Sequence, residues 1–164
     1  MSTSPGTTGP APGASDTADR EIVLQRVFDA PRELVYRAWT EPDHLRQWFG
    51  PNGFHITTHE VDIRVGGVLR FTMHGPDGTD YPNWMRYTEM TPPARLVYDH
   101  GGDAPGDEPN FRVTVTFDDQ GGRTAATMRM VFPNAAARDA TTRFGAVELG
   151  YQTMEKLAAH LAKM

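Results

Sequence analysis

Four polar side chains stand among apolar residues in predicted strands and could do chemistry: Glu60, Arg86, Tyr98 and His100. Glu60 has the same strand parity as Ile56, so we expect it to face the apolar side, where a carboxylate resists ionisation and can act as a general base. Arg86 and His100 are of the type that orients a ligand in an apolar site. Proton transfer would need these groups to converge on one point, and a solvated position is the alternative for each.

The histidine spacing raises the question of a metal site. His55 and His59 have the separation that binds zinc on a helix, but they fall in a predicted strand. Four strand residues span about 13 Å, so one ion cannot bridge the pair unaided. The acidic segment 99–108 lacks the ligand spacing of a calcium loop, and we expect it to be solvated. We therefore predict neither a metal nor another cofactor.

Covalent catalysis lacks its usual nucleophiles in this chain. There is no cysteine, which excludes disulfides, thiolate metal sites and cysteine catalysis. The serines are Ser2, Ser4 and Ser15, all in the first 20 residues. A folded domain that begins after them has no serine to place beside a histidine, so a serine triad is excluded as well.

Length and composition indicate one domain. A chain of 164 residues, 38% of them hydrophobic, is long enough for one buried core and short for two. Residues 1–20 are mostly small or turn-forming, so we expect a disordered tail followed by a domain at 21–164. The formal net charge of -5 gives no basic field for nucleic acid. No segment has the apolar run of a secretory signal or a membrane span, so we expect a cytoplasmic protein without membrane insertion.

Apolar periodicity predicts an α+β fold. A strand at 21–28 precedes a helix that begins near Pro31, and a second short helix closes at Trp48. Turn signals then separate six further segments of strand character, at 54–62, 68–74, 81–90, 95–100, 111–117 and 124–132. We expect a meander of about seven antiparallel strands with one face covered. The cover is a single long helix whose apolar residues recur from Ala140 to Leu161.

Two glycines interrupt this predicted C-terminal helix. Gly145 and Gly150 lie inside it, where each costs about 1 kcal/mol relative to alanine. Close helix-to-sheet packing is one reason for such a residue, and a relaxed stretch beside a cavity is the other. The sequence leaves both open.

Several motifs occur in an order typical of one superfamily. They are Phe28-Asp29-Ala30-Pro31, Asp62 to Gly67, Tyr87 to Val97 and Gly150-Tyr151. On these residues the chain resembles the START-related, birch-pollen-allergen-like (SRPBCC) superfamily, in particular the branch named after the activator of a heat-shock ATPase. The resemblance covers residues 21–164. It implies a helix-grip fold, in which a strongly curved antiparallel sheet (β-α-α-β6-α) wraps around the C-terminal helix and leaves a mostly apolar pocket.

The resemblance also implies which side chains line such a pocket. Projected on this sequence, the lining is Trp48, Phe54, Phe71, Met73, Trp84, Tyr98, Phe111, Val113, Met128, Met130, Phe144, Val147 and Tyr151. For each of them ordinary core packing is the alternative. The chain departs from the family at 83–87, where relatives commonly have a glycine shortly before the tyrosine and this chain has bulky residues, among them Trp84. It would either fill space that a ligand occupies elsewhere or form a flat stacking wall.

Three functions are compatible with this resemblance. The first is a module that binds a small hydrophobic molecule as carrier, sensor or sequestering protein. The second is an aromatase- or cyclase-like enzyme acting on a polyketide-type substrate, with Glu60, Arg86, Tyr98 and His100 for proton transfer. The third is a co-chaperone of a heat-shock ATPase, which we do not expect because the eukaryotic activators carry a further domain. The excess of arginine over lysine is typical of a GC-rich bacterial source, and stand-alone bacterial members often pair as homodimers.

Overall fold

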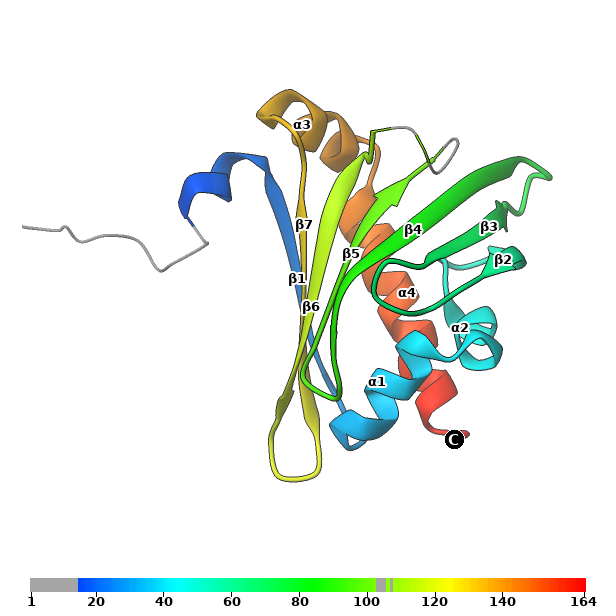
Figure 1. Ribbon diagram of the computed structural model, residues 1–164, viewed down its shortest axis with the longest axis vertical. Coiled ribbons are helices and arrows are strands. Elements are labelled where there is room, and N and C mark those ends of the chain that lie inside the picture. Colours follow the sequence, from blue (N-terminus) through cyan, green and yellow to red (C-terminus); the bar gives the residue numbers. More distant parts are fainter. Residues whose placement is uncertain (1–14, 103–105, 107) are drawn as a thin grey trace, which may run out of the picture.

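The computed structural model describes residues 15–102, 106 and 108–164 of the chain (Figure 1). Seven strands form one antiparallel sheet in the order β1-β7-β6-β5-β4-β3-β2. The strands are β1 (Glu21–Phe28), β2 (His55–Val61), β3 (Val68–His74), β4 (Asp80–Thr91), β5 (Arg95–Gly101), β6 (Phe111–Asp119) and β7 (Thr124–Val131). Neighbours from β2 to β7 are consecutive in the sequence, so the expected meander and the α+β class are confirmed.

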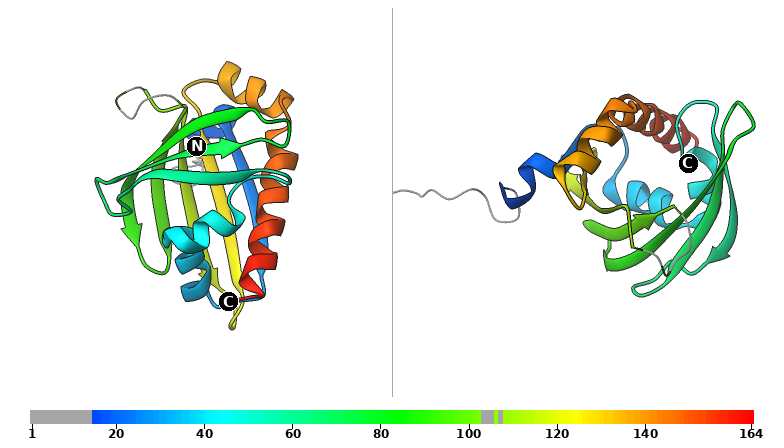
Figure 2. Two further views of the ribbon diagram at one scale, coloured as in Figure 1. Left: turned by 90° about the vertical axis from the view of Figure 1, so that its right-hand side faces the viewer. Right: turned by 90° about the horizontal axis from the view of Figure 1, so that it is seen from above.

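The α-helices lie on the concave side of this sheet or at its end. They are α1 (Arg32–Thr40), α2 (Pro42–Trp48), α3 (Ala135–Arg143) and α4 (Ala146–Leu161). Three of them, α1, α2 and α4, lie on the concave side, and α3 lies at the end of the sheet beside β1. Seen from above in Figure 2, the sheet curves into an open ring that α4 helps to close, and α1 and α2 lie inside it. The buried core fills the concave side, where apolar residues of alternate strand positions meet the helices. Within the described part of the chain, no helix is long and apolar enough to cross a membrane.

Two prolines mark the starts of the short helices. Pro31 is the N-cap of α1, with φ -67° and ψ 149°, and its carbonyl accepts the first helical hydrogen bonds. Pro42 is the first residue of α2, where its missing N–H had no intrahelical partner. The predicted helix start near residue 31 is therefore confirmed. The two helices meet at Glu41, which caps both.

The prediction of one long C-terminal helix is wrong. Gly145 has φ +97°, a left-handed conformation that ends α3 and begins α4. α3 has no buried residue, and Phe144 at the break is 78% exposed. Ala140 and Phe144 are exposed and do not belong to the buried face of α4. Met154, Leu157 and Leu161 form that face, so the predicted apolar stripe is correct only in its C-terminal part.

Gly150 lies where α4 packs closely against β1. A Cβ at this position would lie 2.4 Å from Cδ1 of Leu24 in β1. The glycine thus lets the α4 backbone approach the edge strand more closely than any other residue could. Of the two explanations for a glycine at this position, close helix-to-sheet packing is the one that the structure supports.

The predicted tail differs from the structure in its last six residues. Ser15–Arg20 forms a 3-10 helix, η1, so a disordered tail to residue 20 is wrong for its last six residues. Arg20 Nη1 donates a hydrogen bond to the Phe132 carbonyl (2.7 Å), which ties η1 to the end of β7. The remaining part of the predicted tail, residues 1–14, lies outside the described residues.

Trp84 packs on the opposite face of the sheet from the core. Its neighbours Met85 and Tyr87 belong to the core cluster, whereas Trp84 is fully buried beside Gly101 of β5. The Arg86 guanidinium lies 4.8 Å from the centre of the indole ring, in cation-π contact. Trp84 therefore neither fills a pocket nor forms a wall of one, and both expectations for it are wrong.

Gly101→Ala should destabilise the protein by about 2 kcal/mol or more. A Cβ at Gly101 would lie 2.2 Å from the rigid Trp84 indole, which has no room to move. Gly102→Ala is the matched control, because its nearest neighbour, Asn110 Nδ2, is 3.4 Å away. Urea unfolding measures both. Equal stabilities for the two variants would contradict the packing of Trp84 against Gly101.

Candidate functional site

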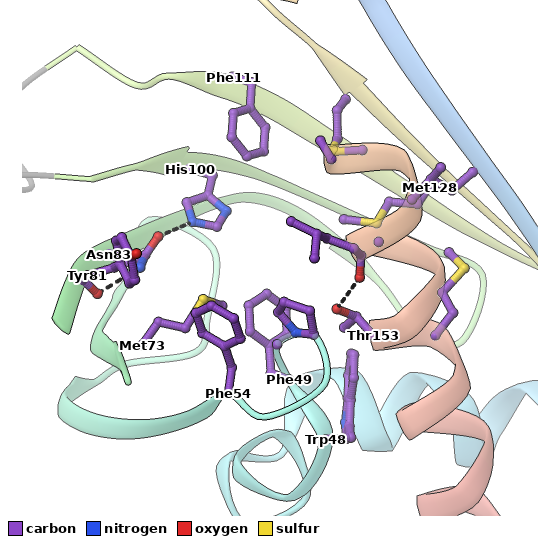
Figure 3. Close-up of a pocket in the computed structure, with 18 of the residues that line it drawn as sticks. Trp48, Phe49, Phe54, Met73, Tyr81, Asn83, His100, Phe111, Met128 and Thr153 are labelled. Atoms are coloured by element: carbon purple, nitrogen blue, oxygen red, sulfur yellow. Dashed lines mark hydrogen bonds between the residues drawn. The ribbon is translucent and has the colours of Figure 1, made fainter. Parts of the chain in front are cut away.

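A cavity of about 370 Å³ lies between the concave face of the sheet, α4 and the segment that joins α2 to β2 (Figure 3). Aromatic and methionine side chains provide most of its surface. The lining residues are Leu24, Trp39, Trp48, Phe49, Gly50, Pro51, Phe54, Met73, Tyr81, Asn83, His100, Asn110, Phe111, Met128, Met130, Phe144, Ala146, Leu149, Gly150, Thr153 and Met154.

Two tryptophans form part of the cavity wall from the helix side. Trp48 Nε1 donates to the Ala38 carbonyl (2.9 Å), which fixes its indole. Trp39 meets Trp48 edge to face, with ring centres 4.9 Å apart. Both side chains are almost fully buried, so this part of the wall is rigid.

The segment from Phe49 to Phe54 is held against α4. Lys156 Nζ donates to the carbonyls of Pro51 (3.2 Å) and Phe54 (3.0 Å), and burial lowers the pKa of this lysine. Gly50 has φ +110°, and a Cβ there would lie 3.2 Å from that of Phe54. The segment therefore has a defined path, and it carries Phe49 and Phe54 to the cavity.

A chain of hydrogen bonds sets the polar edge of the cavity. Asn83 Nδ2 donates to the Tyr81 carbonyl (3.0 Å), so its Oδ1 faces His100 and accepts from Nε2 (2.8 Å). In a neutral imidazole whose Nε2 donates, Nδ1 carries the lone pair. No described residue bonds to this Nδ1. Figure 3 shows Nε2 directed to Asn83 and the opposite edge of the ring directed to the cavity.

Burial keeps the His100 imidazole neutral. Desolvation lowers its pKa from 6.5 to about 4, because an imidazolium would lose its hydration among apolar neighbours. The ring lies 4.9 Å from that of Phe111 and 6.2 Å from that of Phe71, centre to centre. At neutral pH His100 therefore offers a hydrogen-bond acceptor and no charge.

Half of the residues predicted for the site border this cavity. They are Trp48, Phe54, Met73, His100, Phe111, Met128, Met130 and Phe144. Phe144 is 78% exposed, so it stands where the cavity meets the surface. The family resemblance supplied this set apart from His100, and the alternation in β3, β6 and β7 agrees with it at Met73, Phe111, Met128 and Met130.

Five predicted residues lie outside the cavity, three of them in the core and two of them exposed on α4. Phe71, Tyr98 and Val113 point to the concave face but are packed into the core beside the cavity. Val147 and Tyr151 are exposed at 36% and 41%, because they lie to one side of the buried face that Met154, Leu157 and Leu161 form on α4. The inner side of α4 carries Ala146, Leu149, Gly150, Thr153 and Met154 instead.

Three predicted residues do not face the interior. A β-bulge between Thr58 and Glu60 reverses the alternation of β2, so Glu60 pairs with the exposed Arg70 and is itself exposed. Trp84 and Arg86 lie on the opposite face of the sheet. The constellation proposed for proton transfer does not form, because of its four members only His100 lines the cavity.

The two histidines of β2 contact different residues of β3. His59 Nε2 lies 2.7 Å from Thr72 Oγ1, and the His55 ring stacks on that of His74 at 4.7 Å. Among the described residues, no three or more potential ligands are grouped closely enough to hold a metal ion.

Sequence reasoning missed several lining residues. Phe49, Tyr81 and Asn110 lie at element ends or next to them, where no periodicity marks the inner side, and Asn83 is a polar residue inside β4. The Asn83 side chain could have been suspected only from its place on a strand next to His100.

Comparison with known proteins identifies the family of this domain. The family model for Activator of Hsp90 ATPase homolog 1-like protein matches residues 29–162. The chain belongs to this family. The match spans both short helices, all strands after β1, and α4, so the Activator of Hsp90 ATPase homolog 1-like domain includes every lining residue of the cavity except Leu24 of β1. No curated protein matches the chain.

Solved structures share the fold over nearly the full length. A solution structure from Arthrobacter aurescens is 25% identical with a TM-score of 0.82, covering 92% of this chain and 91% of that one. A crystal structure from Nitrosomonas europaea is 25% identical with a TM-score of 0.80, covering 89% and 96%. One from Chromobacterium violaceum is 30% identical with a TM-score of 0.72, covering 87% and 96%. The helix-grip fold and the resemblance on which it was predicted are thus confirmed.

His100→Gln should remove part of the acid sensitivity of this domain. The unfolded chain protonates the histidine below about pH 6.5 and the native state only near pH 4, so the wild-type free energy of unfolding falls between these values. The loss amounts to about 3 kcal/mol at most. Urea unfolding from pH 7 to pH 4 measures it.

The matched control is His59→Gln, at an exposed position. It should reproduce the wild-type pH dependence. If His100→Gln has the same pH dependence as the wild type, the imidazole is not desolvated and the description of this wall is wrong.

Proposed function

We propose that the domain binds a small, mostly apolar molecule in the cavity, as a carrier, sensor or sequestering protein. The observation that carries this proposal is the 370 Å³ cavity with apolar walls and a neutral histidine whose Nδ1 is unpaired among the described residues. Burial of apolar ligand surface supplies affinity, and a single acceptor orients the ligand. A ligand with a hydroxyl or amide N–H that can reach Nδ1 fits best.

The electrostatics favour binding over proton transfer. A pKa of about 4 makes His100 a weak base at neutral pH, because the catalytic optimum lies near the working pH. Glu60 and Arg86, the partners of the cyclase hypothesis, lie outside the cavity. Binding is therefore the function that this geometry supports better than the polyketide cyclase alternative.

A bulky side chain placed in the cavity should weaken binding of an apolar ligand. Ala146 and Val147 are neighbours in α4, but only Ala146 lines the cavity, while Val147 is 36% exposed. Ala146→Trp should weaken binding of the apolar fluorophore N-phenyl-1-naphthylamine at least about tenfold, since its indole would occupy ligand space. A fluorescence titration measures this.

Val147→Trp serves as the matched control and should bind the fluorophore as the wild type does. Circular dichroism establishes that both variants are folded. An equal loss of fluorophore affinity in both variants, or no fluorophore binding by the wild type, would contradict a ligand site inside the cavity.

A further inference from the structure

A second hollow, of about 300 Å³, lies on the opposite face of the sheet from the cavity. On β6, Thr114 and Thr116 alternate with the core residues Val113 and Val115, so the two threonines point away from the core. Figure 2 shows η1, which borders this hollow, outside the ring that the sheet forms with α4. The lining residues are Thr17, Arg95, Thr114, Thr116, Thr127, Arg129 and Val131, none of which lines the cavity.

The strand register places two arginines on either side of the threonines of β6. Arg95 of β5 pairs with Thr116, and Arg129 of β7 pairs with Thr114. Thr127 lies next to Thr116 on the β7 side. Both arginines border the same hollow, so their guanidinium groups and the three hydroxyls surround one space that is open to solvent.

Two carboxylates contact these arginines from outside the hollow. Glu89 accepts a hydrogen bond from Arg95 Nε (3.1 Å), and Glu21 Oε1 lies 3.8 Å from Arg129 Nε. Each carboxylate thus engages the Nε side of one guanidinium and leaves its terminal nitrogens. In the described part of the chain, these terminal nitrogens have no hydrogen-bond partner, and the hydroxyls of the three lining threonines have none either.

The polar groups that line the hollow are suited to an oxyanion. The terminal N–H groups of a guanidinium form paired, charge-assisted hydrogen bonds to phosphate or carboxylate oxygens, and threonine hydroxyls donate as well. Among the described residues, no acidic side chain lines the hollow and would repel an anion there. Donors on three strands reach several oxygens of a tetrahedral phosphate at once, whereas a planar carboxylate offers only two oxygens.

We propose that this hollow binds the phosphate group of a small organic phosphate monoester. Glu21 and Glu89 balance the charges of the two arginines, so attraction comes from hydrogen bonds at short range and the dissociation constant is on the order of 1 mM. A phosphate group fills only part of the hollow, which leaves room for the organic portion. The site is separate from the cavity and does not depend on the function proposed for it.

Amide NMR titrations with glycerol 3-phosphate and with inorganic phosphate test the proposal at constant ionic strength. Both should cause saturable shifts of the β5, β6 and β7 amides beside the hollow, and sodium chloride alone should cause none. We expect glycerol 3-phosphate to bind about threefold more tightly than inorganic phosphate, because its organic portion also contacts the hollow. Equal affinities would overturn the assignment to a monoester and leave a site for the free ion.

Variants of the lining residues connect these shifts to the hollow. Arg95→Gln and Arg129→Gln should each weaken binding at least about fivefold, because each removes charge-assisted hydrogen bonds. Thr116→Val removes one hydroxyl and keeps a β-branched side chain, and we expect a smaller loss. The matched control is Arg123→Gln, an exposed arginine outside the hollow, which should bind as the wild type does. Circular dichroism establishes that all four variants are folded.

The titrations separate this site from the cavity. Shifts that persist unchanged in both Arg95→Gln and Arg129→Gln would refute the site, as would no saturable shift at about ten times the expected dissociation constant. The same variants should bind N-phenyl-1-naphthylamine as the wild type does. A failure of the phosphate site would therefore leave the cavity function standing, and a failure of fluorophore binding would leave the phosphate site standing.

Discussion

The close approach of α4 to β1 at Gly150 is the constraint on which the rest of the structure depends. Because Leu24 occupies the place of a Cβ at this residue, α4 packs on the edge strand instead of across the middle of the sheet. The concave face between α4 and β3 to β5 is then left for smaller elements to cover. α2 and the segment after it do so incompletely, and the space that they leave is the cavity.

Buried polar contacts determine the shape of this cavity. Lys156 holds the segment that carries Phe49 and Phe54, and Asn83 fixes the tautomer of His100 on the opposite wall. Each contact satisfies a donor at the boundary of an apolar space, where an unpaired polar group is costly.

Much of the fold could be predicted from the sequence, because strand alternation and turn residues are local signals. The bounds of the strands at 68–74 and 21–28 were predicted correctly, and the others were close. The residues of the site were harder to predict. The bulge between Thr58 and Glu60 reverses the alternation of β2 and exposes Glu60. The left-handed Gly145 ends the apolar stripe that the sequence predicts through Ala140 and Phe144. Apolar residues occur on both faces of β4, so alternation could not show which face carries Trp84.

Methionine methyl NMR tests the central claim most directly. Met73, Met128, Met130 and Met154 line the cavity, whereas Met90 and Met164 pack elsewhere against the core and serve as internal controls. With methyl-labelled protein and N-phenyl-1-naphthylamine, we predict that the four lining methyls shift together with one saturating dependence on ligand concentration while the two controls stay in place. Shifts confined to the controls, or no shift at saturating ligand, would contradict a binding site between the sheet and α4.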